Sequence, residues 1–166
     1  MAKALFLDRD GTINVDCGYV FEPERFVFVD GIFELCRKAQ KLGYLIIVIS
    51  NQSGVSRGYY AEAQMNACNA HMCAEFAKHG ITVTDVLTCT AADDSDPDRK
   101  PNPGMFLKAV ARHGIDPAAS VAIGDSERDS VAARRAGVGT VILLDSTHML
   151  SGIDLASIEK REDQSR

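Results

Sequence analysis

Two aspartates, Asp8 and Asp10, stand two residues apart directly after a short apolar run near the N-terminus. That run, residues 4–7, is typical of a buried strand in a parallel sheet. At the end of such a strand one carboxylate can attack phosphorus as a nucleophile, while the other transfers protons beside it. Two carboxylates held together near a phosphate require a divalent cation. Gly11 and Thr12 add a tight turn and a hydroxyl, although the same residues could simply form a turn.

Three further polar clusters follow apolar runs later in the chain, at residues 50–54 (SNQSG), 99–101 (RKP) and 124–126 (GDS). Ligands of an open parallel sheet bind at the carboxyl ends of its strands, so these clusters would meet the two N-terminal aspartates at one edge. There they would supply hydroxyl and amide donors, two cations and a further carboxylate. That carboxylate, Asp125, suits the oxygen-rich, six-coordinate shell of Mg²⁺.

Each cluster also has a purely structural interpretation. The residues of 50–54 and 124–126 could cap the helices that follow them. Arg99 and Lys100 could be an ordinary solvated pair, but Lys100 precedes a proline and is therefore held extended, off any helix. Asp129, one helical turn after the last cluster, could orient a metal shell or cap its own helix, and the sequence leaves both open.

Strand-like and helical segments alternate along the chain. The expected strands are residues 4–7, 45–49, 86–89, 121–123 and 140–144. The expected helices are roughly residues 31–41, 61–79, 103–113 and 127–136. Glycines stand just past the helix ends, where a left-handed cap residue is expected, at Gly43, Gly80, Gly114 and Gly137. This alternation predicts right-handed βαβ units, hence a three-layer α/β sandwich with a mostly parallel five-stranded sheet.

Three segments break the alternation. Residues 14–30 are too long for a simple strand-to-helix turn, and the β-rich stretch 26–29 within them predicts a small β-hairpin flap over the site. Residues 90–103 are polar, acidic and proline-bearing, and we expect a loop there. The tail beyond residue 154 is charged and is expected to fray. No stretch is long enough for a separate cap domain, so we expect one domain over residues 1–166.

Composition limits the classes of function. The chain has 166 residues, 46% of them hydrophobic and 25% charged, which is ordinary for a globular protein with a sizeable core. The net charge of −5 argues against a broad nucleic-acid surface. No apolar stretch approaches a transmembrane helix, and the first three residues leave no room for a signal peptide. We expect a cytoplasmic protein, monomeric, with no nucleic-acid or membrane partner.

The five cysteines contain no Cys-x-x-Cys pair and are odd in number, which favours free thiols in a reducing compartment. Cys68, His71 and Cys73 lie close together in sequence. On a helix the first two share a face while Cys73 points elsewhere, and no fourth ligand is obvious. We therefore interpret these three as a packed helix face and not as a zinc site.

In this order, the motifs resemble those of the haloacid dehalogenase superfamily of aspartyl-phosphate phosphotransferases. The family pattern is Asp-x-Asp-x-Thr, then Ser or Thr after the second strand, then Lys, then an acidic metal motif. All four are present, at Asp8/Asp10/Thr12, Ser50, Lys100 and Asp125/Asp129. The match extends from residue 4 to about 145, and so covers nearly the whole chain.

Longer strings narrow the resemblance to one branch of that superfamily. They are DRDGTIN (8–14), GYV (18–20), SNQSGVSRG (50–58) and RKPNPGM (99–105). They resemble the capless D,D-heptose 1,7-bisphosphate phosphatases, a branch that the histidinol-phosphate phosphatases share. The strings are more specific for the branch than for the substrate.

Two departures from that branch stand out. Many members carry a zinc loop, Cys-x-His followed by Cys-x-Cys, before the Arg-Lys-Pro string. Here Cys89 occupies the first ligand position, but residues 90–98 contain no further Cys and no His. One possible ligand cannot form a structural zinc site, so we predict a shortened loop without zinc. Ser126 stands where the heptose enzymes often have a lysine.

The resemblance implies Mg²⁺ held by Asp8, Asp10 and Asp125, and hydrolysis of a phosphomonoester in two in-line steps. Asp8 would become a phosphoaspartate and Asp10 would transfer protons. The resemblance implies that Ser50 and Lys100, together with Mg²⁺, stabilise the negative charge on the phosphoryl oxygens. It also implies a strand order of 3-2-1-4-5.

The resemblance likewise implies the residues that contact the substrate. Arg99 would hold a second phosphate or another substrate anion, because its fork suits bidentate contact. The rest of the pocket would be shaped by Gly18, Tyr19, Asn51, Gln52 and Ser53.

The leading interpretation is a phosphatase of a small sugar phosphate, foremost a D-glycero-D-manno-heptose 1,7-bisphosphate used for lipopolysaccharide, capsule or glycoprotein. Histidinol phosphate is the alternative substrate. A DNA 3′-phosphatase would require a basic groove, which this acidic chain does not suggest. A non-catalytic phosphate-binding module is the alternative of another class, and the intact acidic motifs argue against it.

Overall fold

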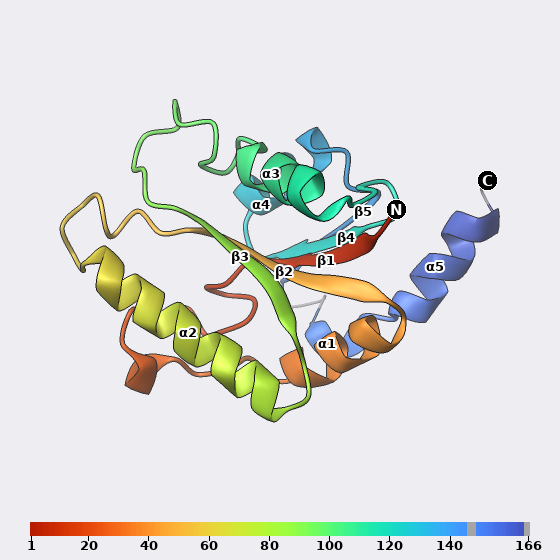
Figure 1. The fold of residues 1–166 in the computed structure, drawn as a ribbon, viewed down its shortest axis with the longest axis horizontal. Coiled ribbons are helices and arrows are strands. Elements are labelled where there is room, and N and C mark those ends of the chain that lie inside the picture. The colour runs from red at the N-terminus through yellow and green to blue at the C-terminus, as the bar shows by residue number, and fades with distance from the viewer. Residues whose placement is uncertain (146–148, 165–166) are drawn as a thin grey trace.

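A computed structural model describes residues 1–145 and 149–164. Its centre is a five-stranded, all-parallel sheet with the strand order β3-β2-β1-β4-β5 (Figure 1), which confirms the predicted order. The strands are β1 (Lys3–Leu7), β2 (Tyr44–Asn51), β3 (Val83–Cys89), β4 (Val121–Gly124) and β5 (Thr140–Leu143). Because β1 lies in the middle, β1, which Asp8 directly follows, and β4, which ends at Gly124, are direct neighbours.

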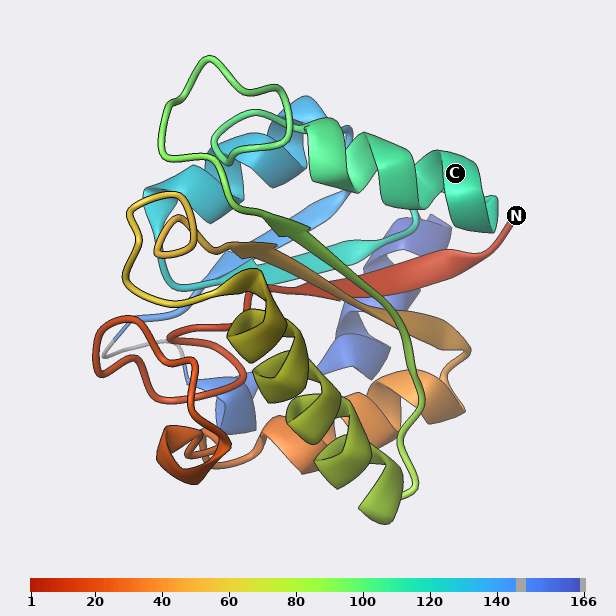
Figure 2. The ribbon, with the colours of Figure 1, turned by 60° about the vertical axis from the view of Figure 1, so that its left-hand side comes forward.

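Helices cover both faces of the sheet, so the predicted three-layer sandwich is confirmed (Figures 1 and 2). One face carries α1 (Ile32–Lys41), α2 (Glu62–Lys78) and α5 (Leu155–Gln164). The other carries α3 (Gly104–His113) and α4 (Glu127–Arg135). The two faces hold separate apolar clusters, and both are needed because each side of a parallel sheet must be buried.

The middle strand shows how the sequence produces these layers. Leu5 and Leu7 point to the α1, α2 face, whereas Ala4 and Phe6 point to the α3, α4 face. All four are at most 1% exposed. A strand buried on both sides has no polar alternation, which is why residues 4–7 form a continuous apolar run.

The segment of residues 14–30 forms less strand than predicted. It contains a short 3₁₀ helix (Pro23–Arg25) and a single antiparallel bridge between Asn14 and Phe28 in place of a regular hairpin. Phe28 packs against Phe33 of α1 and Phe76 of α2, with ring centroids 4.7 and 5.7 Å apart. The β-rich residues are therefore used as a hydrophobic anchor that fixes the loop to the helical layer, and not as a strand.

The C-terminal segment is more ordered than the sequence analysis predicted. Residues that were expected to fray form α5, and its first residue, Leu155, is only 3% exposed. Asp154 precedes the helix and accepts a hydrogen bond from the Ser157 amide at 3.2 Å, which is a normal N-terminal cap. Leu155 in the core, Ile153 and Ile158 packed against it, an ion pair of Glu159 with Lys3 and the cap thus outweigh the charged composition. Within the described ranges, no helix is both long and apolar enough to cross a membrane.

Candidate active site

The pairing of β1 with β4 brings two of the predicted carboxylates to one edge of the sheet. Leu7 pairs with Ile123, and the Asp8 amide donates to the Ile123 carbonyl at 3.0 Å. Asp125 follows two residues later. Gly11, at φ +88°, lets the chain turn back so closely that a Cβ there would lie 1.9 Å from a carboxylate oxygen of Asp125. A glycine is therefore needed at this turn for both its backbone angle and its missing side chain.

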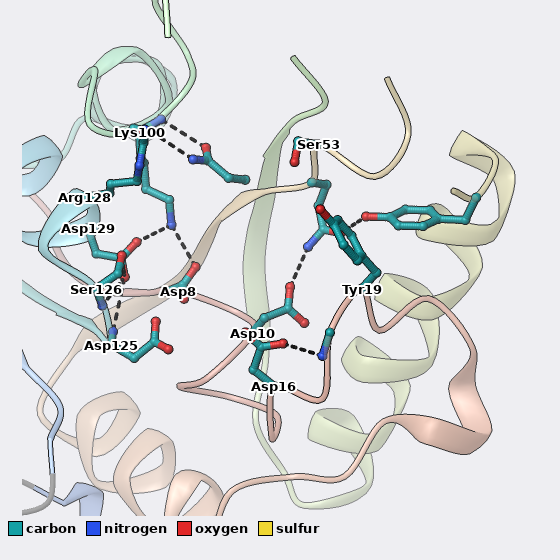
Figure 3. A pocket seen from close by; sticks show the side chains of 14 residues that line it. Asp8, Asp10, Asp16, Tyr19, Ser53, Lys100, Asp125, Ser126, Arg128 and Asp129 are labelled. Carbon is teal, nitrogen blue, oxygen red and sulfur yellow. Dashed lines mark hydrogen bonds and ion pairs between the residues drawn. The ribbon is translucent and has the colours of Figure 1, made fainter. Parts of the chain in front are cut away.

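Three carboxylates gather at this edge, from Asp8, Asp125 and Asp129. One oxygen of each lies within 4.8 Å of the others, the only such group of three metal-ligating side chains among residues 1–145 and 149–164 (Figure 3). Burial, first of all, raises the pKa of Asp8 well above its usual range, and the nearby Asp129 and Asp125 carboxylates add to it. Burial also raises the pKa of Asp125. Such a group of carboxylate oxygens fits a hard divalent cation, which would relieve their repulsion.

Asp129 has the helix-capping role that the sequence left open, and it also lies among the carboxylates that could hold a metal ion. Its Oδ2 accepts hydrogen bonds from the Asp125 and Ser126 amides at 3.2 and 3.1 Å, and so caps α4. Its Oδ1 lies 2.6 Å from Nζ of Lys100. A Cβ at Gly124 would come within 2.4 Å of the Asp129 Cβ, so glycine at the end of β4 permits this approach.

Lys100 is the buried cation of the site. Its side chain is 3% exposed, and Nζ lies 2.8 Å from Asp8 Oδ1 and donates to the Ile49 carbonyl at 2.8 Å. Burial alone would lower the pKa of Lys100, but the Asp8 and Asp129 carboxylates raise it. The lysine is therefore charged across the physiological range and offsets part of the negative charge of the acidic group.

The main chain of Lys100 is held from two sides. The Asn51 side chain both donates to the Lys100 carbonyl and accepts from the Lys100 amide, each at 3.0 Å. Arg128 donates to the same carbonyl at 2.7 Å. Asn51, expected in the substrate pocket, thus also anchors the loop that delivers the lysine.

Asp10 lies apart from the acidic group. Its Oδ1 accepts from Asn14 at 3.0 Å and from Arg9 at 3.0 Å, and its Oδ2 accepts from Gln52 at 2.9 Å. We expected Asp10 among the metal ligands, but the structure places its carboxylate with these donors, while Asp129 joins Asp8 and Asp125. Gln52 also donates to Ser50 Oγ at 2.8 Å. Ser50 is only 1% exposed and is not among the residues that line the pocket.

These groups open into a pocket of about 350 Å³. The predicted residues Gly18, Tyr19, Asn51, Gln52 and Ser53 all line it. Tyr19 has a left-handed backbone, φ 48°, which is costly for a bulky residue and marks a constrained loop. Its ring is 47% exposed and packs edge-on against Tyr59, with centroids 4.7 Å apart. Tyr19 lies across the pocket from Lys100 and Asp125 (Figure 3).

Arg99 is not among the residues that line the pocket. Its Nε donates to Asp94 at 2.9 Å and its NH1 donates to the Ala91 carbonyl at 2.9 Å, so it holds the preceding loop. Arg128 lines the pocket instead, and pairs with both oxygens of Asp94 at 2.9 and 2.7 Å. Together the two guanidinium groups lower the pKa of Asp94 to about 2.

Sequence reasoning missed three pocket residues, namely Asp16, Tyr60 and Arg128, and it placed Ser126 at this edge without giving it a role. Position offered a signal for Arg128, because it lies in the first turn of a helix that begins at the carboxyl edge of the sheet, where ligands bind. Tyr60 carried no comparable signal. Its hydroxyl donates to Gln52 Oε1 at 2.6 Å, a contact that depends on the fold of residues 53–60.

Comparison with known proteins agrees with this geometry. The HAD-hydrolase-like family profile matches residues 98–160. A D-glycero-alpha-D-manno-heptose-1,7-bisphosphate 7-phosphatase from Burkholderia mallei is 47% identical over 150 residues, covering 86% of this chain and 79% of that protein. A D-glycero-beta-D-manno-heptose-1,7-bisphosphate 7-phosphatase from Vibrio cholerae is 42% identical over 154 residues, covering 87% and 82%.

Among solved structures, the D,D-heptose 1,7-bisphosphate phosphatase from B. bronchiseptica, complexed with magnesium and phosphate, superposes with a TM-score of 0.81. It is 29% identical, with 99% of both chains covered. The fold and the acidic site are those of a haloacid dehalogenase-type hydrolase. Within that superfamily, the chain belongs to the D,D-heptose 1,7-bisphosphate phosphatase family.

Proposed function

We propose that this chain is a Mg²⁺-dependent phosphatase that removes the 7-phosphate of a D-glycero-D-manno-heptose 1,7-bisphosphate. The observation that carries the chemistry is the group of Asp8, Asp125 and Asp129 around Lys100, with Asp10 facing the same pocket. The relatives from Burkholderia and Vibrio support the substrate, and their names include both anomers.

The residues divide the chemistry between them. A carboxylate oxygen of Asp8 forms a bond to phosphorus as the bond to the sugar oxygen breaks, and Asp10 donates a proton to that leaving oxygen. Asp10 then takes a proton from a water, which attacks the phosphoaspartate and releases phosphate. Lys100 holds positive charge beside Asp8 throughout, at the place where the phosphoryl oxygens arrive. Ser50, behind Gln52, completes the donor set that we infer from the family pattern.

We assign the metal site to Asp8, Asp125 and Asp129, with Asp10 retained as a candidate ligand from the family resemblance. When bound, Mg²⁺ would neutralise charge on the transferring phosphoryl group. Hard carboxylate oxygens favour it over softer metals. No zinc is expected, because Cys89 has no partner cysteine or histidine in residues 90–98.

The metal assignment predicts that EDTA abolishes phosphate release and that Mg²⁺ alone restores it. Elemental analysis of the purified protein should find no stoichiometric zinc. One zinc per chain that survives dialysis would show that the loop at residues 90–98 carries a metal site after all.

Proton competition should make Mg²⁺ binding depend on pH. The raised pKa values of Asp8 and Asp125 mean that these carboxyls take up protons at a higher pH than exposed aspartates. A protonated carboxyl binds a cation poorly, so the affinity for Mg²⁺ should fall as pH is lowered, beginning at a higher pH than for a site made of exposed aspartates. Calorimetric titration at several pH values measures this, and an affinity that stays constant as the pH is lowered would contradict the assignment.

Recognition of a second phosphate on the substrate should depend on Arg128, the arginine that lines the pocket. Arg128→Ala should lower kcat/KM for the bisphosphate by about 10- to 150-fold, the value of a charge-assisted contact of roughly 1.5–3 kcal/mol. An aryl monophosphate should lose less, and its loss should reflect only the missing hydrogen bond from Arg128 to the Lys100 carbonyl. Arg99→Ala should have a smaller selective effect, because Arg99 contacts the loop and not the pocket. Arg112→Ala, paired with Asp85 away from the pocket, is the control.

Equal, small effects of both arginine variants on both substrates would weaken the bisphosphate assignment. A monophosphate such as histidinol phosphate would then be the better candidate. In that case Arg128 and Arg99 would serve only to hold Asp94 and its loop.

A screen of phosphorylated metabolites tests the substrate directly. It should include both anomers of the heptose 1,7-bisphosphate, histidinol phosphate and common sugar phosphates. We expect the highest kcat/KM with one heptose anomer, and phosphorus NMR should show loss of the 7-phosphate. Faster turnover of histidinol phosphate would overturn the substrate assignment while leaving the phosphatase chemistry in place.

We further propose a cytoplasmic enzyme that acts as a monomer on a small metabolite. The five cysteines are unpaired, which suits a reducing compartment. All the groups assigned to the chemistry come from a single chain, so the site needs no partner subunit. Sedimentation equilibrium would test the monomer.

A further inference from the structure

Arg9 lies between the two aspartates of the motif, yet it does not reach the pocket. Its side chain is fully buried and is the largest such side chain in the described part of the protein. A guanidinium keeps its charge at any relevant pH and carries five N–H donors. Burying it is costly unless acceptors surround it, so its partners indicate why it is there.

The guanidinium joins three separate segments. NH2 donates to Asp10 Oδ1 at 3.0 Å, with Nε 3.3 Å from the same oxygen, and it also donates to the Val20 carbonyl. NH1 donates to Asn69 of α2 at 2.9 Å. The ring of Phe26 lies 5.7 Å from the guanidinium carbon. The end of β1, the loop of residues 14–30 and α2 therefore meet on one buried cation.

Two of these contacts concern the reaction. Asp10 is the acid–base carboxylate, and among residues 1–145 and 149–164 Arg9 supplies the only charged donor to its Oδ1, beside the Asn14 amide. Val20 directly follows Gly18 and Tyr19, which line the pocket. One side chain therefore fixes both the orientation of the Asp10 carboxylate and the seating of the loop that contacts the substrate.

We propose that Arg9 is a positioning residue that couples the pocket loop, at Val20, to the acid–base carboxylate of Asp10. The inference rests on the proposed phosphatase chemistry, but not on the heptose as substrate. Since both contacts share NH2, a displacement of the loop shifts the donor that orients Asp10. Proton delivery to the leaving oxygen is then favoured when the loop is seated on the substrate.

The dependence on the leaving group tests this role. Dinitrophenolate leaves without a proton, whereas a sugar alkoxide needs one. We expect Arg9→Met and Arg9→Lys to lower kcat/KM for the wild type's best sugar phosphate at least about tenfold more than for 2,4-dinitrophenyl phosphate. The parameter kcat/KM reports the steps through transfer to Asp8, so later hydrolysis does not mask the effect.

Asn69→Ala is the matched control. It removes the hydrogen bond from the same guanidinium to its third partner and leaves a buried donor unpaired, but it touches neither Asp10 nor Val20. We expect it to lower the melting temperature without selectivity between the two substrates. Arg9→Lys keeps the buried charge, and so provides a folded variant even where Arg9→Met does not fold.

Two outcomes would overturn the proposal. One is an equal loss on both substrates in the Arg9 variants, and the other is the same selective loss in Asn69→Ala. A further check uses an Asp10→Asn background, where Arg9→Lys should cause no additional loss on the sugar phosphate. If the wild type cleaved neither substrate, the proposed function itself would fail, and Arg9 would have no reaction to serve.

Discussion

Asp8→Asn should abolish turnover while leaving the fold intact. The amide is nearly isosteric with the carboxylate but is a poor nucleophile, and it removes one charge from the acidic group at the carboxyl edge. Loss of the covalent nucleophile should raise the barrier by on the order of 8 kcal/mol or more. Phosphate release from an aryl phosphate and from the bisphosphate should both fall to background.

The fold should survive this change because Lys100 retains Asp129 as a partner at 2.6 Å. Circular dichroism and thermal melting would verify it. Asp93→Asn, the same isosteric change on an exposed loop, is the control and should retain full activity. Near-normal activity of Asp8→Asn, free of wild-type enzyme, would refute the phosphoaspartate mechanism.

The fold was predictable from local patterns because a sheet that is buried on both faces leaves a plain signature. Residues 4–7 and 45–49 are continuous apolar runs, and both are buried strands in the structure. Parallel connections then bring the strand ends to one edge, so Asp8 and Asp125 could be placed together before any coordinates. The type of each element, and the order of the elements along the chain, follow from chemistry that lies within each segment.

What could not be predicted depends on contacts between distant segments. The ion pair of Asp129 with Lys100 requires the lysine to arrive from another loop, and no residue near Asp129 in sequence indicates that contact. The family resemblance implied Arg99 at the substrate, because a guanidinium fork suits bidentate contact with an anion. Asp94 accepts its Nε–H instead, a partner selected by the geometry of an irregular loop. The orientation of a long side chain is decided by tertiary structure, which spacing in sequence does not encode.

The same limit explains the errors in the peripheral segments. The β-rich stretch at residues 26–29 buries its apolar side chains by packing on helices, as Phe28 does against Phe76. These side chains are therefore buried without the formation of a full hairpin. The charged tail gains order from a few apolar residues, Leu155 with Ile153 and Ile158, and from a cap at Asp154. Single tertiary contacts of this kind outweigh average composition.

Lys100→Met should damage chemistry and stability together, which distinguishes it from the Arg128 and Arg99 variants. Methionine is of similar length but carries no charge, so the transferring phosphoryl group loses a preorganised buried cation. Removing one such donor typically costs about 10²- to 10³-fold in rate. The loss should be equal for the bisphosphate and for an aryl monophosphate, because Lys100 contacts the nucleophile Asp8 and not the distal part of the substrate.

The loss of thermal stability in Lys100→Met should depend on whether Mg²⁺ is present. Without Lys100, three crowded carboxylates at the end of β1 and the start of α4 face each other with no buried cation. Leaving buried charge unpaired costs roughly 3–5 kcal/mol, so the melting temperature of Lys100→Met should fall in metal-free buffer. Added Mg²⁺ should raise that temperature more than it does in the wild type, because the cation replaces part of the missing charge. Lys108→Met, on an exposed pair with Asp98, should show neither effect. If Mg²⁺ raised the melting temperature equally in wild type and in Lys100→Met, Lys100 and the metal would not share the same carboxylates.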